Sequence, residues 1–163
     1  MNLPYTAFKN FTSSIVKEIY RGEESLTEAY APMSVTITLE DDIDVSRGNV
    51  ITKQNNQPES LKEIDIMACW FNEKPLNPSM KYVIKHSTSD VLGKFQEVVY
   101  KMDISTLTRN SEDKEIGLND IFKAKIRVSQ PLLCDPYFRN RRTGSLIIVD
   151  ETSNETVAAG MVV

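Results

Sequence analysis

The residues that could do chemistry are few and widely spaced in this chain of 163 residues. His86 is the only histidine, and it lies between Lys85 and a run of small polar residues typical of a turn after a strand. A closed Cys/His zinc site needs four ligands, and one histidine with two cysteines cannot supply them. We therefore expect His86 to be an exposed loop residue rather than a catalytic base or a metal ligand.

Sequences that bind nucleotide phosphates are absent. A phosphate-binding loop of the GxxxxGK(S/T) type holds phosphates with backbone amides and a lysine, and no such segment occurs around the six glycines. The guanine-reading (N/T)KxD pattern is absent as well. We expect no catalytic residue, cofactor site or metal site on this chain by itself.

Two groups of carboxylates invite other interpretations. The acidic cluster within residues 40–44 lacks the glycine and the distal glutamate of a helix-loop-helix calcium site, so we interpret it as a solvated turn. Gly48 follows Arg47 and fits a turn with positive φ ahead of a strand at Val50. Asp135, Asp150 and Glu151 lie near predicted turns, and a carboxylate pair in a barrel mouth would suggest a stand-alone enzyme, the weakest of the alternatives.

A loop over residues 135–144, with the sequence DPYFRNRRTG, combines aromatic and basic side chains. Aromatic residues and arginine are enriched at the centres of protein interfaces, because they bury large areas and make several directed hydrogen bonds. In the alternative interpretation, the aromatic rings fold back to cap a barrel end and the arginines stay solvated. The candidate interface residues are Tyr137, Phe138, Arg139, Arg141 and Arg142.

The elements that must position this loop are β-strands. Apolar and polar residues alternate with period two, which is typical of half-buried antiparallel strands. We expect one face of Ile64, Ile66, Ala68 and Trp70, a second of Phe122, Ala124, Ile126 and Val128, and a third of Val98, Tyr100, Met102 and Ile104. A short helical turn is expected only over residues 25–30. Strands are predicted at 35–39, 63–70, 98–104, 122–128, 146–149 and 157–163.

Composition limits the kinds of partner that the protein can bind and the cellular compartment that we expect for it. The formal net charge of −4 provides no general attraction to nucleic acid or to an anionic membrane. We expect a cytoplasmic protein, with neither a signal peptide nor a membrane span, and unpaired Cys69 and Cys134. The polar segment 54–60, which contains Pro58, is interpreted as a linker between two domains.

Several blocks of sequence resemble one family in the same order. The blocks are VTITLEDDIDVSRGNVI at 35–51, MACWFNEKPLNPSMKYVIK at 67–85, YKMDISTLTR at 100–109 and the segment 116–162. They resemble the large, GTPase-type subunit of bacterial sulfate adenylyltransferase, and the first block is also similar to the RGxVL element of elongation factor Tu. The resemblance covers about four fifths of the chain, but the family's GTPase domain is absent and the early strands around residues 1–11 are shortened or replaced.

The resemblance implies an all-β fold of elongation-factor-type antiparallel barrels. Residues 1–53 would form part of a translation-factor-type second domain, whose completeness is left open, and 61–163 the C-terminal barrel. The family couples GTP hydrolysis to the formation of adenosine 5′-phosphosulfate from ATP and sulfate, so GTP and magnesium would belong to the missing domain. Expected partners are that GTPase domain and the small subunit. The alternative is an accessory barrel of a translational GTPase that binds RNA or protein.

Overall fold

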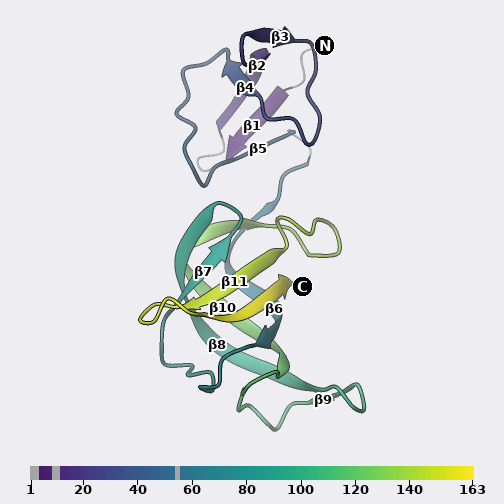
Figure 1. Ribbon diagram of the computed structural model, residues 1–163, viewed down its shortest axis with the longest axis vertical. Helices are drawn as coiled ribbons and strands as arrows, with labels where there is room; N and C mark the ends of the chain where they lie inside the picture. The colour runs from purple at the N-terminus through teal and green to yellow at the C-terminus, as the bar shows by residue number, and fades with distance from the viewer. Residues whose placement is uncertain (1–3, 9–11, 54–55) are drawn as a thin grey trace. The chain divides into compact units, whose positions relative to one another are not determined.

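The computed structural model describes residues 4–8, 12–53 and 56–163, and every strand pairing in it is antiparallel. The chain divides into two compact units, Met1–Gln57 and Pro58–Val163 (Figure 1). Within the described residues there is no helix, and therefore none long and apolar enough to cross a membrane. The prediction of an all-β protein is confirmed.

The N-terminal unit is a small sheet. Its strands follow the order β3-β2-β1-β5, and β4 also pairs with β2. The pairings among the described residues leave this sheet open. A positive φ of 96° at Gly48 turns the chain into the last strand, as predicted. The strands are β1 (Pro4–Phe8), β2 (Thr12–Arg21), β3 (Glu24–Leu26), β4 (Thr36–Leu39) and β5 (Val50–Lys53).

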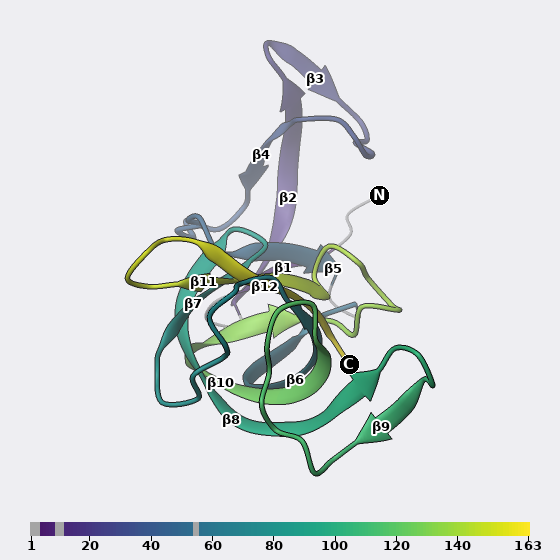
Figure 2. The same cartoon turned by 60° about the horizontal axis from the view of Figure 1, so that its bottom comes forward.

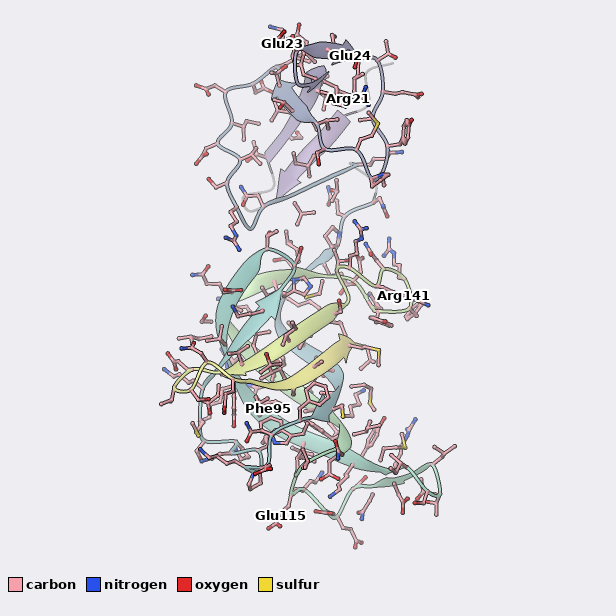
Figure 3. All side chains as sticks on the ribbon, viewed as in Figure 1. Arg21, Glu23, Glu24, Phe95, Glu115 and Arg141 are labelled. Atoms are coloured by element: carbon pink, nitrogen blue, oxygen red, sulfur yellow. The ribbon has the colours of Figure 1, made fainter. Side chains whose placement is uncertain are left out.

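The helical turn expected over residues 25–30 is wrong. Ser25 lies in β3 directly opposite Tyr20, because β2 and β3 are joined by a tight turn and form a hairpin. Gly22 takes a positive φ of 63° at this turn, which a glycine adopts at little cost. An ion pair of 2.9 Å between Arg21 Nη2 and Glu24 Oε2 closes the hairpin (Figure 3).

The C-terminal unit is a closed barrel of six strands. Their order is β10-β6-β12-β11-β7-β8, and pairing of β8 with β10 closes the ring (Figure 2). The short β9 pairs with the far end of β8 and extends the sheet outside the ring. The strands are β6 (Glu59–Trp70), β7 (Tyr82–His86), β8 (Ser89–Asp103), β9 (Thr108–Asn110), β10 (Ile121–Cys134), β11 (Ser145–Asp150) and β12 (Thr156–Val162).

The apolar residues that alternate along two of the strands fill the barrel interior, as predicted. The expected faces of β6, from Ile64 to Trp70, and of β10, from Phe122 to Val128, are buried throughout. Tyr82 contacts the Trp70 ring edge-on, with centroids 6.0 Å apart, and meets the Phe95 ring at 5.6 Å. Such edge-to-face contacts stabilise a core beyond the area that they bury.

On β8 the expected face is wrong beyond Val98. The register between β8 and β10 shifts twice, and each shift inserts one extra residue into β8. A bulge reverses the sides on which the following residues lie, so Phe95 and Val98 are both buried although three positions apart. Tyr100 and Met102 are only half-buried, and Ile104 is 65% exposed in the turn that follows.

The boundary between the two units falls within the segment 54–60. Residues 54–55 lie outside the described residues. Glu59 and Ser60 already belong to β6, where they lie opposite Cys134 and Leu133 at the end of β10.

Candidate interaction site

The loop over residues 135–144 leaves the end of β10 and returns at the start of β11. Asp135 at its first position is only 9% exposed and accepts a hydrogen bond of 2.7 Å from Thr143 Oγ1. The backbone amide of Asp135 donates to the carbonyl of Thr143 at 3.2 Å. These two bonds join the first and the penultimate residues of the loop and fix its base.

His86 holds one of these two ends of the loop, at Thr143, from within the barrel. It is 3% exposed, and its Nε2 lies 2.8 Å from the carbonyl oxygen of Thr143. Because a carbonyl only accepts, Nε2 must carry the proton and donate. The expectation that His86 is an exposed loop residue is therefore wrong. Tyr82, Ile84 and His86 alternate inward along β7, and this period-two pattern could have revealed the burial from the sequence.

Gly144 allows the loop to pack closely against its own beginning. A Cβ at this position would lie 2.4 Å from Tyr137 Cα and 2.8 Å from the carbonyl oxygen of Asn140. The amide of Tyr137 donates to the carbonyl of Val162 at 2.9 Å, and the amide of Val162 donates to the carbonyl of Gly144 at 2.8 Å. The loop is therefore bonded to β12 as well as to its own ends.

The side chains of this loop face outward. Phe138 is 90% exposed, so it does not cap the barrel as the alternative interpretation expected, while Tyr137 is half-buried. The Arg141 guanidinium lies 6.0 Å above the Tyr137 ring, and Arg139 Nη1 lies 3.9 Å from Asp135 Oδ1. All three arginines are exposed, and Figure 3 shows Arg141 on the loop beside the barrel. The loop presents an exposed aromatic ring and three exposed arginines on a backbone that is held by hydrogen bonds.

The other candidates do not assemble into a site. Asp150 accepts backbone hydrogen bonds from Thr152 at 2.7 Å and Ser153 at 3.1 Å, which lower its pKa and cap the turn between β11 and β12. Asp135 lies at the opposite end of β11, roughly 17 Å away at about 3.4 Å a residue. The two carboxylates therefore cannot act as a pair, and nowhere in the described residues do three His, Cys, Asp or Glu side chains gather to hold a metal.

The acidic cluster forms an exposed turn, as predicted. Asp41 accepts a hydrogen bond of 2.8 Å from Ser14 Oγ, which fastens the turn to β2, and Asp44 accepts one from Ser46. Cys69 and Cys134 are both free.

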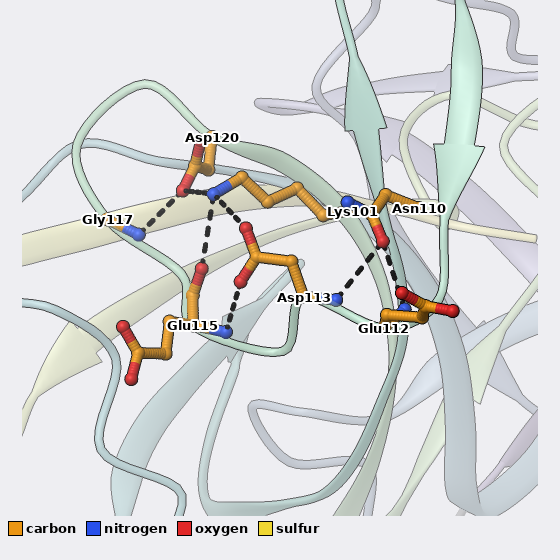
Figure 4. Close-up of polar contacts among 7 residues, drawn as sticks. All are labelled: Lys101, Asn110, Glu112, Asp113, Glu115, Gly117 and Asp120. Carbon is orange, nitrogen blue, oxygen red and sulfur yellow. Dashed lines mark hydrogen bonds and ion pairs between the residues drawn. The ribbon is translucent and has the colours of Figure 1, made fainter.

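A polar network fixes the loop at the other end of the barrel. After the second bulge Lys101 lies opposite the buried Phe122, and its ammonium is 2.8 Å from Asp120 Oδ2 and 3.1 Å from Asp113 Oδ2 (Figure 4). Lys114 reaches back from this loop and donates to the carbonyls of Val98 and Val99 at the bulge, at 2.6 and 2.7 Å. The sequence alone did not reveal this network, because the bulges decide which side of β8 Lys101 occupies.

We expect Lys101→Met to lower the free energy of unfolding by about 1 kcal/mol at pH 7, because the ion pairs are partly buried but reached by water. The hydrogen bond from Lys101 is the largest cause that lowers the pKa of Asp113 below its ordinary 3.8. A lowered carboxyl pKa stabilises the fold above the ordinary value and ceases to do so as the pH falls through the folded one. The difference between variant and parent should therefore shrink between pH 7 and pH 3.

Urea unfolding at these two pH values measures the effect. Lys94→Met, on the exposed face of the same strand, is the matched control and should change the midpoint little. Equal midpoints for the Lys101 variant and its parent at pH 7 would contradict a stabilising role for the network.

Comparison with known proteins identifies the fold family. A family model described as GTP-eEF1A C-terminal domain-like matches residues 63–163, more than half of the chain. The chain belongs to this family. The solved structure of sup35 complexed with GDP has the same fold, with a TM-score of 0.85 over 98% of this chain and 40% of that one, at 17% sequence identity.

Curated relatives of this GTP-eEF1A C-terminal domain-like chain are proteins of sulfate activation. The bifunctional enzyme CysN/CysC of Rhodopirellula baltica is 43% identical over 96% of this chain, and sulfate adenylyltransferase subunit 1 of Sulfurovum sp. is 45% identical over 88%. The chain spans only 24% and 30% of these two proteins. The resemblance to the barrel region of the sulfate adenylyltransferase large subunit is confirmed.

Proposed function

We propose that this chain is the non-catalytic barrel portion of a sulfate adenylyltransferase GTPase subunit and serves domain and subunit interaction. The observation that carries the proposal is the loop over residues 135–144, which holds Phe138 at 90% exposure among three exposed arginines. A large exposed apolar ring on a bonded backbone loses little entropy on binding, so it is suited to anchor a protein contact.

The proposed partners are the GTPase domain of the same kind of subunit and the small subunit of sulfate adenylyltransferase. In this scheme GTP and magnesium bind the GTPase domain, and adenosine 5′-phosphosulfate forms on the complex rather than on this chain. Contacts that differ between two nucleotide states are what coupling requires, and the loop would provide part of them. The division into residues 1–53, 54–60 and 61–163, and the cytoplasmic location, stay predictions.

An accessory barrel of a translational GTPase is the second candidate. The exposed Phe138 and the neighbouring arginines could stack on and pair with RNA, but the net charge of −4 opposes a general attraction to it.

Binding measurements test the proposal directly. Calorimetry with GTP and magnesium should show no saturable binding to the chain, because none of its segments has a phosphate-loop sequence. Titration with the separately produced small subunit and GTPase domain of the Sulfurovum relative should show saturable binding to at least one. Binding of RNA with neither protein bound would favour the translational alternative, and micromolar binding of GTP would show a nucleotide site on this chain.

A further inference from the structure

The outer wall of the barrel carries a continuous apolar row. Strand register places Ile147 opposite Ala159, Ala159 opposite Cys69, Cys69 opposite Ile121, and Ile121 opposite Met102. The row therefore crosses β11, β12, β6, β10 and β8 without a polar residue, and it spans roughly 19 Å at about 4.8 Å between strands. Met161 and Met67 lie opposite each other two positions farther along β12 and β6. We call these seven residues the outer-wall patch.

These side chains point away from the core. Their neighbours Ile148, Ala158, Ala68 and Phe122 on the same strands are buried inside the barrel. Ile147 remains 43% exposed and Met161 41%, and the other members of the patch are half-buried. The outer face of a one-layer barrel normally carries polar residues, and a contiguous apolar area on it marks an interaction surface.

Charged residues flank the row at both ends. Lys85 lies opposite Ile147 on β7 and forms an ion pair of 3.3 Å with Asp90 on β8. Arg109 lies opposite Met102 on β9, and the Arg109 guanidinium is 4.9 Å above the Tyr100 ring. An apolar centre with a charged rim is the usual composition of a protein interface. The complementary surface is therefore apolar in the middle and carries a carboxylate toward the end at Arg109.

A second copy of the chain is the alternative occupant. A face-to-face dimer has its two-fold axis in the plane of the interface. With the axis along the row, Arg109 would meet its own equivalent, and with the axis across the row it would meet Lys85, which is already paired with Asp90. Neither of these two arrangements gives Arg109 an unpaired carboxylate.

We propose that the outer-wall patch docks the part of a sulfate adenylyltransferase subunit 1 polypeptide that lies outside the segment matched by this chain. This inference rests on the proposed function. The chain spans 30% of the Sulfurovum relative and 34% of the Pseudoalteromonas atlantica relative, so most of each polypeptide has no counterpart here. Within one polypeptide, a linked domain meets the patch at high effective concentration, so a contact of this modest size suffices.

Cys69 provides a probe at the middle of the row. Cys134 is 1% exposed, and its burial raises its pKa to about 12, so maleimide should label Cys69 first. The probe partner is the Sulfurovum subunit 1 with its matched 144-residue segment removed, checked for folding by its own GTP binding. Saturating partner should slow the labelling of Cys69, followed by mass spectrometry, by about tenfold.

Glutamate substitutions locate the contact. Ile147→Glu and Met161→Glu should each weaken partner binding by about tenfold, which corresponds to about 1.4 kcal/mol. Leu107→Glu is the matched control, since Leu107 is 77% exposed in the turn between β8 and β9, outside the patch. It should leave both the affinity and the labelling unchanged.

The outcomes separate this inference from the proposed function. If the partner binds while labelling and the glutamate variants are unaffected, the outer-wall patch is not the contact, and the proposed function stands. If neither the folded partner nor the small subunit binds, the proposed function fails, and this inference fails with it. If Cys69 is labelled more slowly as the concentration of the chain rises without any partner, and sedimentation shows a dimer, a second copy covers the patch. The inference is then overturned.

Discussion

Replacing Gly144 by alanine should lower the free energy of unfolding by about 3 kcal/mol, at the upper end of the usual cost of overpacking. The new Cβ would lie 2.4 Å from Tyr137 Cα and 2.7 Å from Tyr137 N, and both are backbone atoms that cannot rotate away. Either the loop over residues 135–144 moves off the start of β11, or the hydrogen bonds at its base are lost. Urea unfolding measures the loss.

Gly117→Ala is the matched control, because the nearest atom to its new Cβ is Asp120 Oδ2 at an ordinary 3.8 Å. It should change stability by less than about 0.5 kcal/mol. If the two variants unfold at the same urea concentration, the close packing of the loop does not contribute to stability.

The second large effect is expected on binding. Replacing Arg141 and Arg142 together by alanine should weaken capture of the GTPase domain or the small subunit by about thirtyfold, which corresponds to about 2 kcal/mol. The backbone hydrogen bonds of both residues, to Ser145 Oγ and Asn140 Oδ1, do not depend on their side chains. The melting temperature should therefore stay nearly unchanged. Arg139 is left in place because its guanidinium lies close to the buried Asp135.

Lys81→Ala with Lys94→Ala removes the same charge from exposed positions outside the loop. Calorimetry of the arginine variant, this control and Phe138→Ala then separates a specific contact from a general effect of charge. Equal weakening by both double variants would indicate only long-range electrostatics, and unchanged affinity in the arginine variant would rule out the loop as the contact surface.

Alternation predicted the barrel well where strands are regular. The buried faces of β6 and β10 follow directly from period two, because their register with each other is unbroken from Ile121 to Arg127. The same rule failed on β8, since a bulge depends on the partner strand and leaves no local signal. The helical turn over residues 25–30 failed because a hairpin, set by Gly22, places Ser25 and Leu26 in a strand.

The candidate site was predicted in its residue types but not in its shape. Tyr137, Phe138 and the arginines could be selected by chemistry alone, whereas the fixed base of their loop depends on His86, Thr143 and Gly144 meeting in three dimensions. His86 was missed although its strand showed the inward alternation, because the polar residues that follow it were given more weight. The outer-wall patch could not be predicted, because it requires the register of five strands.

Closure of the barrel has a consequence for how the protein folds during synthesis. The first strand of the ring, β6, pairs with the last, β12, and also with β10, so its neighbours are made only late in translation. Such long-range pairing is slow, since the entropy of a large loop must be lost before the contacts form. Until Thr156–Val162 has left the ribosome, β6 keeps an unpaired edge and the interior stays open to water. The nascent barrel is thus exposed to aggregation for most of its synthesis, and its last strand completes it.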